Sequence, residues 1–284
     1  MEDVMADTRC IVETRRVVEL ACAAPSVRNS QPWLWRLGDH RIELHADQSR
    51  RLPLTDPRGR GVILSCGAAL HHARVAAAAL GLPAQVEYAP DLDRPSHLAT
   101  LHLTPGEPSA LAAADLDALA KRCTDRRRFT AWPVPDERLA TLASTASAPG
   151  TQVLPLLDIG PRLRVELLVN RAVDRQEHGH SPRGEHVEGS DGLLVLLTER
   201  DDPRAWLSAG EALSQVWLAA TTDGLSLVPL SCVIEDEETR SELHREVLGG
   251  LAEPQLVIRI GWQQIGRSEL RRTGRRAFSD ILLP

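Results

Sequence analysis

The sequence predicts an α+β protein built from two similar halves, and three observations lead to this prediction. Apolar residues recur at helical spacing in several runs of the 284-residue chain. Short alternating or continuous apolar runs between them have the pattern of strands. Two Ala-rich helical runs end near Gly81 and Gly224, and the difference between 224 and 81 is 143 positions, against a half-chain of 142. This spacing fits an internal duplication, but helix–glycine–strand order is common in any protein that alternates the two elements.

In the first half, residues 9–24 are expected to form a helix, because apolar residues recur at helical spacing and Pro25 ends the run. Residues 41–46 alternate in the manner of a strand. Residues 62–80 again present one apolar helical face, and Gly81 supplies the stop. Further elements are expected at 85–88 (strand), 98–103 (strand) and 110–121 (helix).

In the second half, residues 203–222 carry an apolar helical face and stop before Gly224. Residues 227–231 are interpreted as a buried strand that leads into a turn. Residues 171–192 are polar, contain four glycines and have no apolar period, so they are expected to form a flexible loop. Further strands are expected at 152–157, 193–198 and 255–260.

Composition excludes several functional classes. The chain has 33 basic and 39 acidic residues, a formal charge of −6, which makes it a poor general partner for nucleic acid or an anionic membrane. Six Trp, one Tyr and two Phe are too few for a platform on which single-stranded bases stack. We therefore expect no nucleic-acid partner.

The cysteines and the start of the chain indicate a cytoplasmic protein without a metal. Five cysteines without a Cys-x-x-Cys pair predict neither disulfides nor a zinc knuckle. His178, His180 and His186 lack cysteine or carboxylate ligands at suitable spacing, so a solvated loop is preferred there. Charges throughout the first twenty residues exclude a signal peptide. The sequence has no run of 18 apolar residues, so no membrane span is expected.

The first segment that could carry chemistry lies between two prolines. It reads Pro-Ser-Val-Arg-Asn-Ser-Gln-Pro and follows the first helix. Its backbone amides and short polar side chains could hydrogen-bond the edge of a planar heterocycle. The simpler interpretation is a helix-to-strand turn that uses Ser and Asn as caps. Its candidate residues are Pro25, Ser26, Val27, Arg28, Asn29 and Gln31.

Two arginine clusters suggest a bound anion. Residues 122–128 contain four arginines, and residues 271–276 contain four more. A guanidinium group binds phosphate through two parallel hydrogen bonds. The alternatives are solvated charged turns that pair with nearby carboxylates, or two separate surface patches.

Together these segments resemble the FMN-dependent nitroreductases, and among them the Acg-type actinobacterial flavin proteins. The phrase at 24–33 resembles the turn that lies along the isoalloxazine ring in that family. Arg-Cys-Thr-Asp-Arg at 122–126 resembles the motif that contacts the flavin phosphate, ribityl chain and pyrimidine edge. The resemblance also includes the stretches at 65–72, 205–213 and 254–261, and so covers nearly the whole chain.

The resemblance implies FMN as the cofactor and a nitroreductase fold. It implies cofactor contacts from the turn, from the arginine motif, from the end of the strand at 227–231, and from two late arginines near the phosphate. No catalytic residue is assigned, because the flavin carries the chemistry. Beyond the turn, the implied cofactor ligands are Arg122, Thr124, Arg126, Arg127, Pro229, Leu230, Ser231, Arg275 and Arg276.

The resemblance also explains a duplicated chain. Nitroreductases are usually homodimers in which each FMN receives the turn from one subunit and the arginine motif from the other. Here the halves 1–118 and 119–284 carry one each, so a monomer is expected to act as a pseudo-dimer with one FMN.

The implied function is NAD(P)H-dependent reduction of a small nitroaromatic or quinone-like acceptor. The Acg-type relatives have a longer insertion that folds over the flavin, whereas residues 171–192 are short here and are expected to leave the flavin face open. The alternative is a non-catalytic protein that binds or sequesters FMN.

Overall fold

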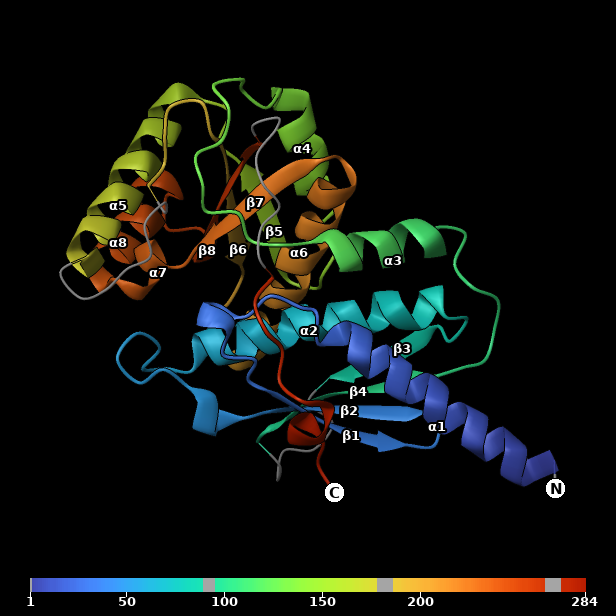
Figure 1. Cartoon of the computed structure of the whole chain (residues 1–284). Helices are drawn as coiled ribbons and strands as arrows, with labels where there is room; N and C mark the ends of the chain where they lie inside the picture. Colours follow the sequence, from blue (N-terminus) through green and yellow to red (C-terminus); the bar gives the residue numbers. More distant parts are fainter. Residues whose placement is uncertain (1, 89–94, 178–185, 264–271) are drawn as a thin grey trace. The chain divides into compact units, whose positions relative to one another are not determined.

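The computed structural model describes residues 2–88, 95–177, 186–263 and 272–284, without the side chains of residues 2–11 (Figure 1). The chain forms two compact units. The first contains residues 1–121 together with 273–284, and the second contains residues 122–272.

The first unit has a four-stranded antiparallel sheet with strand order β1-β2-β4-β3. Helices α1 and α2 lie on the same face of this sheet (Figure 1). That face is apolar, since Trp33, Trp35, Ile42 and Leu44 are fully buried there. The elements are α1 (Glu2–Ala21), β1 (Trp33–Gly38), β2 (Arg41–Ala46), α2 (Arg60–Ala79), β3 (Ala84–Tyr88), β4 (His97–Leu103) and α3 (Ala112–Lys121), with short turns η1 (Val27–Asn29), η2 (Gln48–Arg50) and η4 (Phe278–Ile281).

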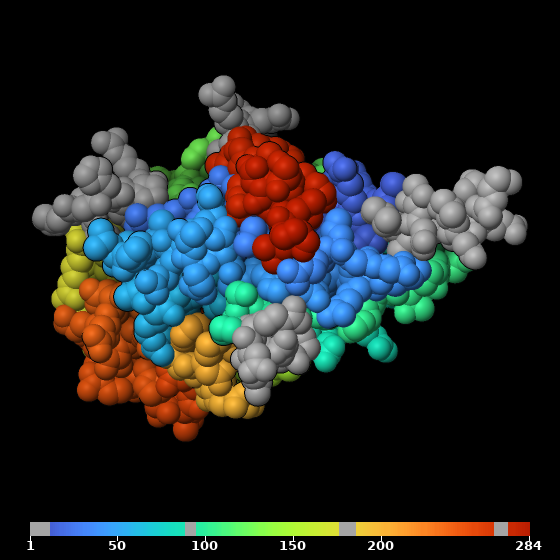
Figure 2. Space-filling model, turned by 90° about the horizontal axis from the view of Figure 1, so that it is seen from below, coloured from blue at the N-terminus to red at the C-terminus, as the bar shows by residue number. Residues whose placement is uncertain are grey.

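The end of the chain closes the first unit. Leu282 pairs with Trp35 in a parallel bridge, and the Leu283 N–H donates to the Trp35 carbonyl at 2.7 Å. Arg36 donates from Nε to the Pro284 carbonyl at 3.0 Å. Figure 2 shows this C-terminal segment, in red, lying on residues near the start of the chain. It covers the edge of β1 that would otherwise have unpaired backbone groups.

The second unit contains another four-stranded antiparallel sheet, with strand order β5-β6-β8-β7. Strand β6 is buried along its whole length, as expected for an inner strand with continuous apolar sequence. The elements are α4 (Asp136–Ser144), β5 (Thr151–Pro155), α5 (Ile159–Glu177), β6 (Gly192–Thr198), α6 (Pro203–Thr222), β7 (Leu225–Leu230), α7 (Cys232–Glu235), α8 (Glu237–Glu242), a π-helical turn η3 (Leu243–Val247) and β8 (Glu253–Trp262).

The two units repeat one topology. In each, two strands precede a 20-residue helix and two strands follow it, with the same order across the sheet. The register shifts once between corresponding strands, at Leu44/His45 in β2 and at Leu196/Leu197 in β6. Gly81 and Gly224 follow the two helices with φ of 76° and 74°, a conformation that favours glycine. The shared topology supports the internal duplication.

The α+β prediction is confirmed. Helix α6 and strand β2 have the predicted bounds, 203–222 and 41–46. The interpretation of residues 171–192 as a loop is wrong at both ends. Residues 171–177 complete α5, where Ala172 and Val173 are fully buried, and residue 192 begins β6. Residues 178–185 of that prediction lie outside the described residues.

The observed units also differ from the expected halves. The expected boundary between 118 and 119 falls inside α3, which continues to Lys121. The expected second half ran to residue 284, whereas residues 273–284 pack with the first unit. Strand β1 and helices α4 and α5 are not among the elements expected from the sequence.

Within the described residues, helix α2 has the length and apolar composition of a membrane span. However, 78% of that stretch is buried inside the structure, and the core helix of a folded domain has the same composition. Its buried residues face α1 and the sheet, so this helix forms part of the core of the first unit.

Candidate functional site

The turn after α1 has an unusual backbone. Arg28, Asn29 and Gln31 have positive φ values of 48°, 57° and 49°, in the left-handed region that non-glycine residues seldom adopt. Within the turn, the Gln31 N–H donates to Ser26 Oγ at 3.0 Å. The Val27 N–H donates to Ser65 Oγ of α2 at 3.2 Å. Such strain persists only where the surroundings enforce it, and it is concentrated at functional sites.

Gln31 anchors the turn through the C-terminal segment. Its side chain is buried, and its Oε1 accepts from the Arg276 N–H at 2.8 Å. In return, Arg276 Nη1 donates to the Gln31 carbonyl at 3.0 Å. The same guanidinium group lies 3.4 Å from Asp47 Oδ2 and also donates to the Asp280 carbonyl.

Arg275 holds the other side of the turn. Its Nε donates to the Cys22 carbonyl at 2.9 Å and its Nη2 to the Ala23 carbonyl at 3.1 Å. These carbonyls directly follow α1, where a cation is favoured by the helix dipole. Nη1 lies 3.3 Å from Asn29 Oδ1, and Asn29 Nδ2 donates to the Gly274 carbonyl at 3.0 Å.

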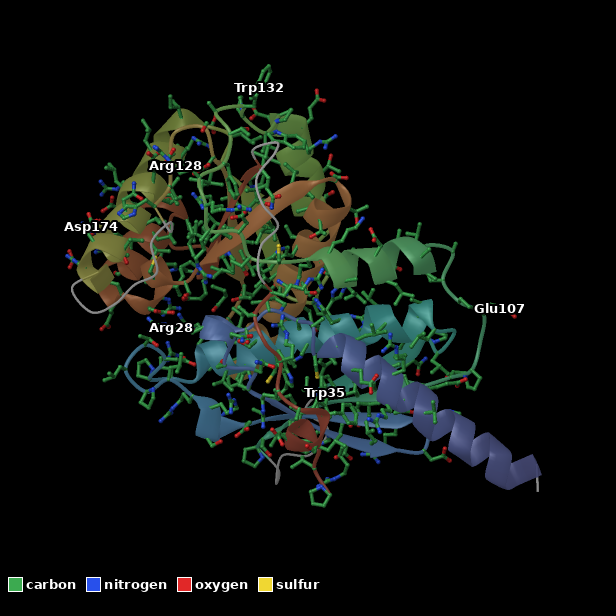
Figure 3. The ribbon with its side chains drawn as sticks, in the orientation of Figure 1. Arg28, Trp35, Glu107, Arg128, Trp132 and Asp174 are labelled. Atoms are coloured by element: carbon green, nitrogen blue, oxygen red, sulfur yellow. The ribbon has the colours of Figure 1, made fainter. Side chains whose placement is uncertain are left out.

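This geometry changes the role expected for the late arginines. The resemblance implies that Arg275 and Arg276 lie at a phosphate, but the donors described above are directed at protein acceptors. We therefore interpret both residues as supports of the turn. In contrast, Arg28 is exposed at the tip of the turn (Figure 3), and Pro25, Ser26, Val27 and Asn29 are partly exposed beside it.

The arginine segment of the second unit is ordered by its own aspartate. Asp125 is buried and pairs with Arg127 through two hydrogen bonds, Nε to Oδ1 at 2.8 Å and Nη2 to Oδ2 at 2.7 Å. The Arg127 N–H also donates to Asp125 Oδ1 at 3.0 Å. Arg122 is buried, with its guanidinium carbon 4.7 Å from the ring centroid of Trp217. Thr124 and Arg126 are partly exposed between them.

Arg259 of β8 holds this segment through its backbone carbonyls. It is not among the site residues expected from the sequence. Its buried side chain donates from Nη2 to the carbonyls of Arg126 and Arg127 at 3.4 and 3.3 Å. Its guanidinium carbon lies 4.5 Å from the ring centroid of Phe129. Its Nη1 lies 3.5 Å from Asp191 Oδ2. The signal in the sequence was a single charge in the apolar run 254–261.

The buried Asp191 and the glycine beside Phe129 show how tightly Arg259 is enclosed. Burial raises the pKa of the Asp191 carboxyl, although Arg259 and the Glu188 N–H act in the opposite direction. A Cβ atom added to Gly261 would lie 2.3 Å from the Phe129 ring, so only glycine fits there. The Arg126–Arg127 backbone therefore rests on a close-packed base.

The predicted residues at the end of β7 divide between core and surface. Leu230 is fully buried and belongs to the core of the second unit. Pro229 and Ser231 are partly exposed, and Pro229 lies on an edge strand, where its missing N–H costs no sheet hydrogen bond. The Ser231 carbonyl accepts from the N–H groups of Ile234 and Glu235 and so begins α7.

The donor set suits a cofactor that combines an anion with a ring rich in carbonyl groups. The structure brings residues 25–31 together with Arg275 and Arg276 in the first unit. It brings residues 122–127 together with Arg259 in the second. Guanidinium groups, a hydroxyl and side-chain amides are the groups expected around a phosphate and the polar edge of a flavin.

Comparisons with known proteins place this site in a wider context. No family model matches the chain. Two curated Mycobacterium tuberculosis proteins are similar over nearly their whole length. "Putative NAD(P)H nitroreductase Rv3131" is 34% identical over 310 residues, covering 94% of this chain and 90% of that protein. "Putative NAD(P)H nitroreductase acg" is 32% identical over 309 residues, covering 92% and 91%.

A solved structure supports the same fold. The crystal structure of "a putative nitroreductase" from Anabaena variabilis superposes with a TM-score of 0.59 and 11% sequence identity, covering 85% of this chain and 82% of that one. The match extends over both units, and so exceeds what a single shared sheet would give.

Proposed function

Since the chain belongs to the nitroreductase family and to its Acg-like members, we propose that it is an FMN-dependent oxidoreductase. NAD(P)H is the proposed electron donor, and a small nitroaromatic or quinone-like compound is the proposed acceptor. The observation that carries the proposal is the strained turn at 26–31, which two arginines hold from the far end of the chain. A protein maintains such a costly backbone where a ligand must meet groups fixed in advance.

In the first unit, the exposed part of the turn is the proposed contact with the ring. Ser26, Arg28 and Asn29 supply hydroxyl, guanidinium and amide groups, while Gln31 stays buried and fixes the backbone. Arg275 and Arg276 bind no cofactor directly in this proposal. Their contribution is to hold the left-handed residues in one conformation, so that no ordering is needed when FMN binds.

In the second unit, Arg122 and Thr124 are the proposed ligands of the phosphate and ribityl chain. Arg126 is the proposed charge beside the pyrimidine edge, because Arg127 is paired with Asp125. FMN, when bound, supplies the transfer of a hydride from NAD(P)H and of electrons to the acceptor. A positive charge fixed beside the ring edge stabilises the negative charge that reduction creates there. Arg259 keeps Arg126 in place by holding its carbonyl.

One chain is proposed to bind one FMN. The repeated strand order supports a single chain whose two units correspond to the two subunits of a nitroreductase homodimer. The first unit has the Pro-Ser turn and the second has the Arg-x-Thr motif, and neither half has a good second copy of the other's motif. A ratio of one FMN per chain, measured by absorption against protein concentration, is therefore expected for a monomer.

The test is anaerobic mixing of the yellow protein with NADH and with NADPH. Bleaching of the flavin followed by steady turnover with a quinone supports the proposed enzyme. A flavin that stays oxidised with both donors contradicts it. Tight FMN that is reduced without turnover would instead favour the flavin-sequestering alternative.

A matched pair of variants tests the residue assignment. Arg126→Ala should slow flavin reduction at least tenfold, because the charge beside the ring is lost. Arg128→Ala is the control, since Arg128 is exposed and pairs with Glu188 on the surface (Figure 3). Equal rates for the two variants would remove Arg126 from the site.

A further inference from the structure

We propose that Glu43, His45 and His97 bind a divalent transition metal such as Zn²⁺, at a site separate from the proposed flavin chemistry. One ligand atom from each of the three side chains lies within 4.8 Å of the other two. All three residues are buried, with 6%, 4% and 2% of their surface exposed. No metal was expected from the cysteines or from the histidines at 178, 180 and 186, and these three residues were not among the candidates.

Strand register explains how the cluster forms. Glu43 and His45 are two residues apart on β2, so their side chains point to the same face of the sheet. His97 is the cross-strand partner of His45 on β4, at the register shift after Leu44. Their rings stack with centroids 4.6 Å apart and an angle of 17° between planes. The face is the one opposite the apolar face that α1 and α2 cover.

The hydrogen bonds prepare the imidazoles for coordination. His97 Nε2 lies 3.0 Å from the hydroxyl of the fully buried Thr100. When Nε2 donates to that hydroxyl, the lone pair is on Nδ1, and a fixed tautomer of this kind is typical of metal-binding histidines. His45 Nε2 lies 3.1 Å from Glu43 Oε2, so an ion between them replaces a proton that the two residues share.

The dimensions suit zinc after a small adjustment. Ligand atoms at 2.0–2.1 Å from a tetrahedral ion are about 3.3 Å apart. The Glu43–His45 pair, at 3.1 Å, is close to that spacing, and the ligand atom of His97, within 4.8 Å of both, moves closer when the ion binds. Two imidazoles and one carboxylate leave the fourth coordination position of a tetrahedral ion open, as in zinc sites with three protein ligands.

Two arginines compete with the ion for Glu43. Arg41 donates to Oε1 at 2.6 Å and Arg36 to Oε2 at 3.1 Å. Both guanidinium side chains are more than one-third exposed, at 46% and 39%, so they can turn into solvent. Because Arg41 is a cation that competes for Glu43, Arg41→Ala should increase the affinity for the metal. A cluster that only stabilises the fold predicts no such increase.

The experiment is calorimetric titration of chelator-treated, FMN-loaded protein with ZnCl₂, and with NiCl₂ for comparison. One equivalent should bind with a Kd of about 1 μM or below. His45→Gln and His97→Gln should each weaken binding at least tenfold, and Thr100→Val about tenfold. His102→Ala is the matched control, because His102 lies on the same strand and bonds an exposed Glu87. It should leave the affinity unchanged.

Two results overturn the proposal. The first is wild-type protein with no equivalent tighter than about 100 μM, a result that needs no variant to fold. The second is affinity that is unchanged in folded His45→Gln and His97→Gln proteins, with FMN content and melting temperature verifying the fold. A weaker Zn²⁺ affinity in Arg41→Ala contradicts the competition described above and, with it, Glu43 as a ligand.

Discussion

Arg276 and Gln31 form a reciprocal pair across 245 positions of sequence. The backbone N–H of Arg276 donates to the side chain of Gln31 at 2.8 Å, and the side chain of Arg276 donates to the backbone carbonyl of Gln31 at 3.0 Å. Each residue thus fixes the main chain of the other. The pair fastens the end of the chain to the turn that is proposed to meet the flavin.

Arg276→Ala should therefore reduce both stability and cofactor binding. We expect the free energy of unfolding to fall by about 2–3 kcal/mol, because partly buried charged hydrogen bonds to Gln31 and Asp47 are lost. FMN affinity should fall at least tenfold as the left-handed residues relax. Urea unfolding and FMN titration measure the two effects.

Arg200→Ala is the control for this prediction, since Arg200 forms an exposed pair with Asp202 and should change stability by less than about 0.5 kcal/mol. Loss of FMN from Arg276→Ala without a change in stability would contradict the supporting role. That result would instead favour Arg276 as a ligand of the FMN phosphate.

Arg259→Met should be among the most destabilising single changes in the second unit. It leaves the buried Asp191 carboxylate without its cation and frees the carbonyls of the Arg126–Arg127 backbone. Breaking a buried ion pair on one side costs about 3–5 kcal/mol. Chemical unfolding gives the value, and a loss below about 1 kcal/mol would show that Arg259 does not anchor the segment.

The same variant should have an unusual pH dependence. Burial raises the pKa of Asp191 above its ordinary value, so the folded state holds its proton at a pH where the unfolded state has lost it. The contribution of Asp191 to stability therefore increases as the pH falls through the folded pKa. Removing Arg259 raises that pKa further. The deficit of Arg259→Met should therefore be smaller at a mildly acidic pH than at neutral pH.

Asp191→Asn provides the check on this pH prediction. When Arg259→Met is made in the Asp191→Asn background, residue 191 titrates in neither protein, so the stability difference between the double variant and the Asp191→Asn single variant should lose the part of its pH dependence that Asp191 causes. Unfolding curves at both pH values measure it, and a deficit of Arg259→Met that grows toward acid would show the sign to be wrong.

Among the four cysteines whose side chains are described, Cys123 should be alkylated first. Cys22, Cys66 and Cys232 are buried, and burial raises the pKa of Cys22 to about 12 and also raises that of Cys66. Cys123 is half-buried, and its pKa is raised by burial as well, so its reaction should accelerate with rising pH.

Peptide mapping of iodoacetamide-treated protein in a Cys10→Ser background measures this order. Saturating FMN should slow the labelling of Cys123, which lies between the proposed ligands Arg122 and Thr124. Unchanged labelling with and without FMN would place the cofactor away from this segment, and faster labelling of Cys22 would contradict the order.

The local sequence predicts those elements whose ends are marked by residues that start or stop a helix. Helix α6 was predicted with the correct ends, because Pro203 occupies the first turn and Gly224 follows the last. The Asp202 side chain caps it by accepting from the Ala205 N–H. Strand β1 was missed, because Trp-Leu-Trp lacks the polar alternation of an ordinary strand.

Helix α5 was missed for a different reason. Its core face is formed by Val165, Val169, Ala172 and Val173, and the last two lie in a stretch whose charges and following glycines suggested a loop. The contacts of Arg275 and Arg276 could not be inferred at all. Hydrogen bonds between residues about 245 positions apart follow from tertiary folding, and no local pattern contains them.

The return of residues 273–284 to the first unit has a consequence for biosynthesis. Translation proceeds from the amino end, so the turn at 26–31 is synthesised long before Arg275 and Arg276, which hold it. A nascent or truncated chain without residues 273–284 therefore lacks the arginine contacts that hold the turn at 26–31. Uptake of the cofactor at the turn is therefore expected to depend on arginines that the ribosome adds about 245 positions later.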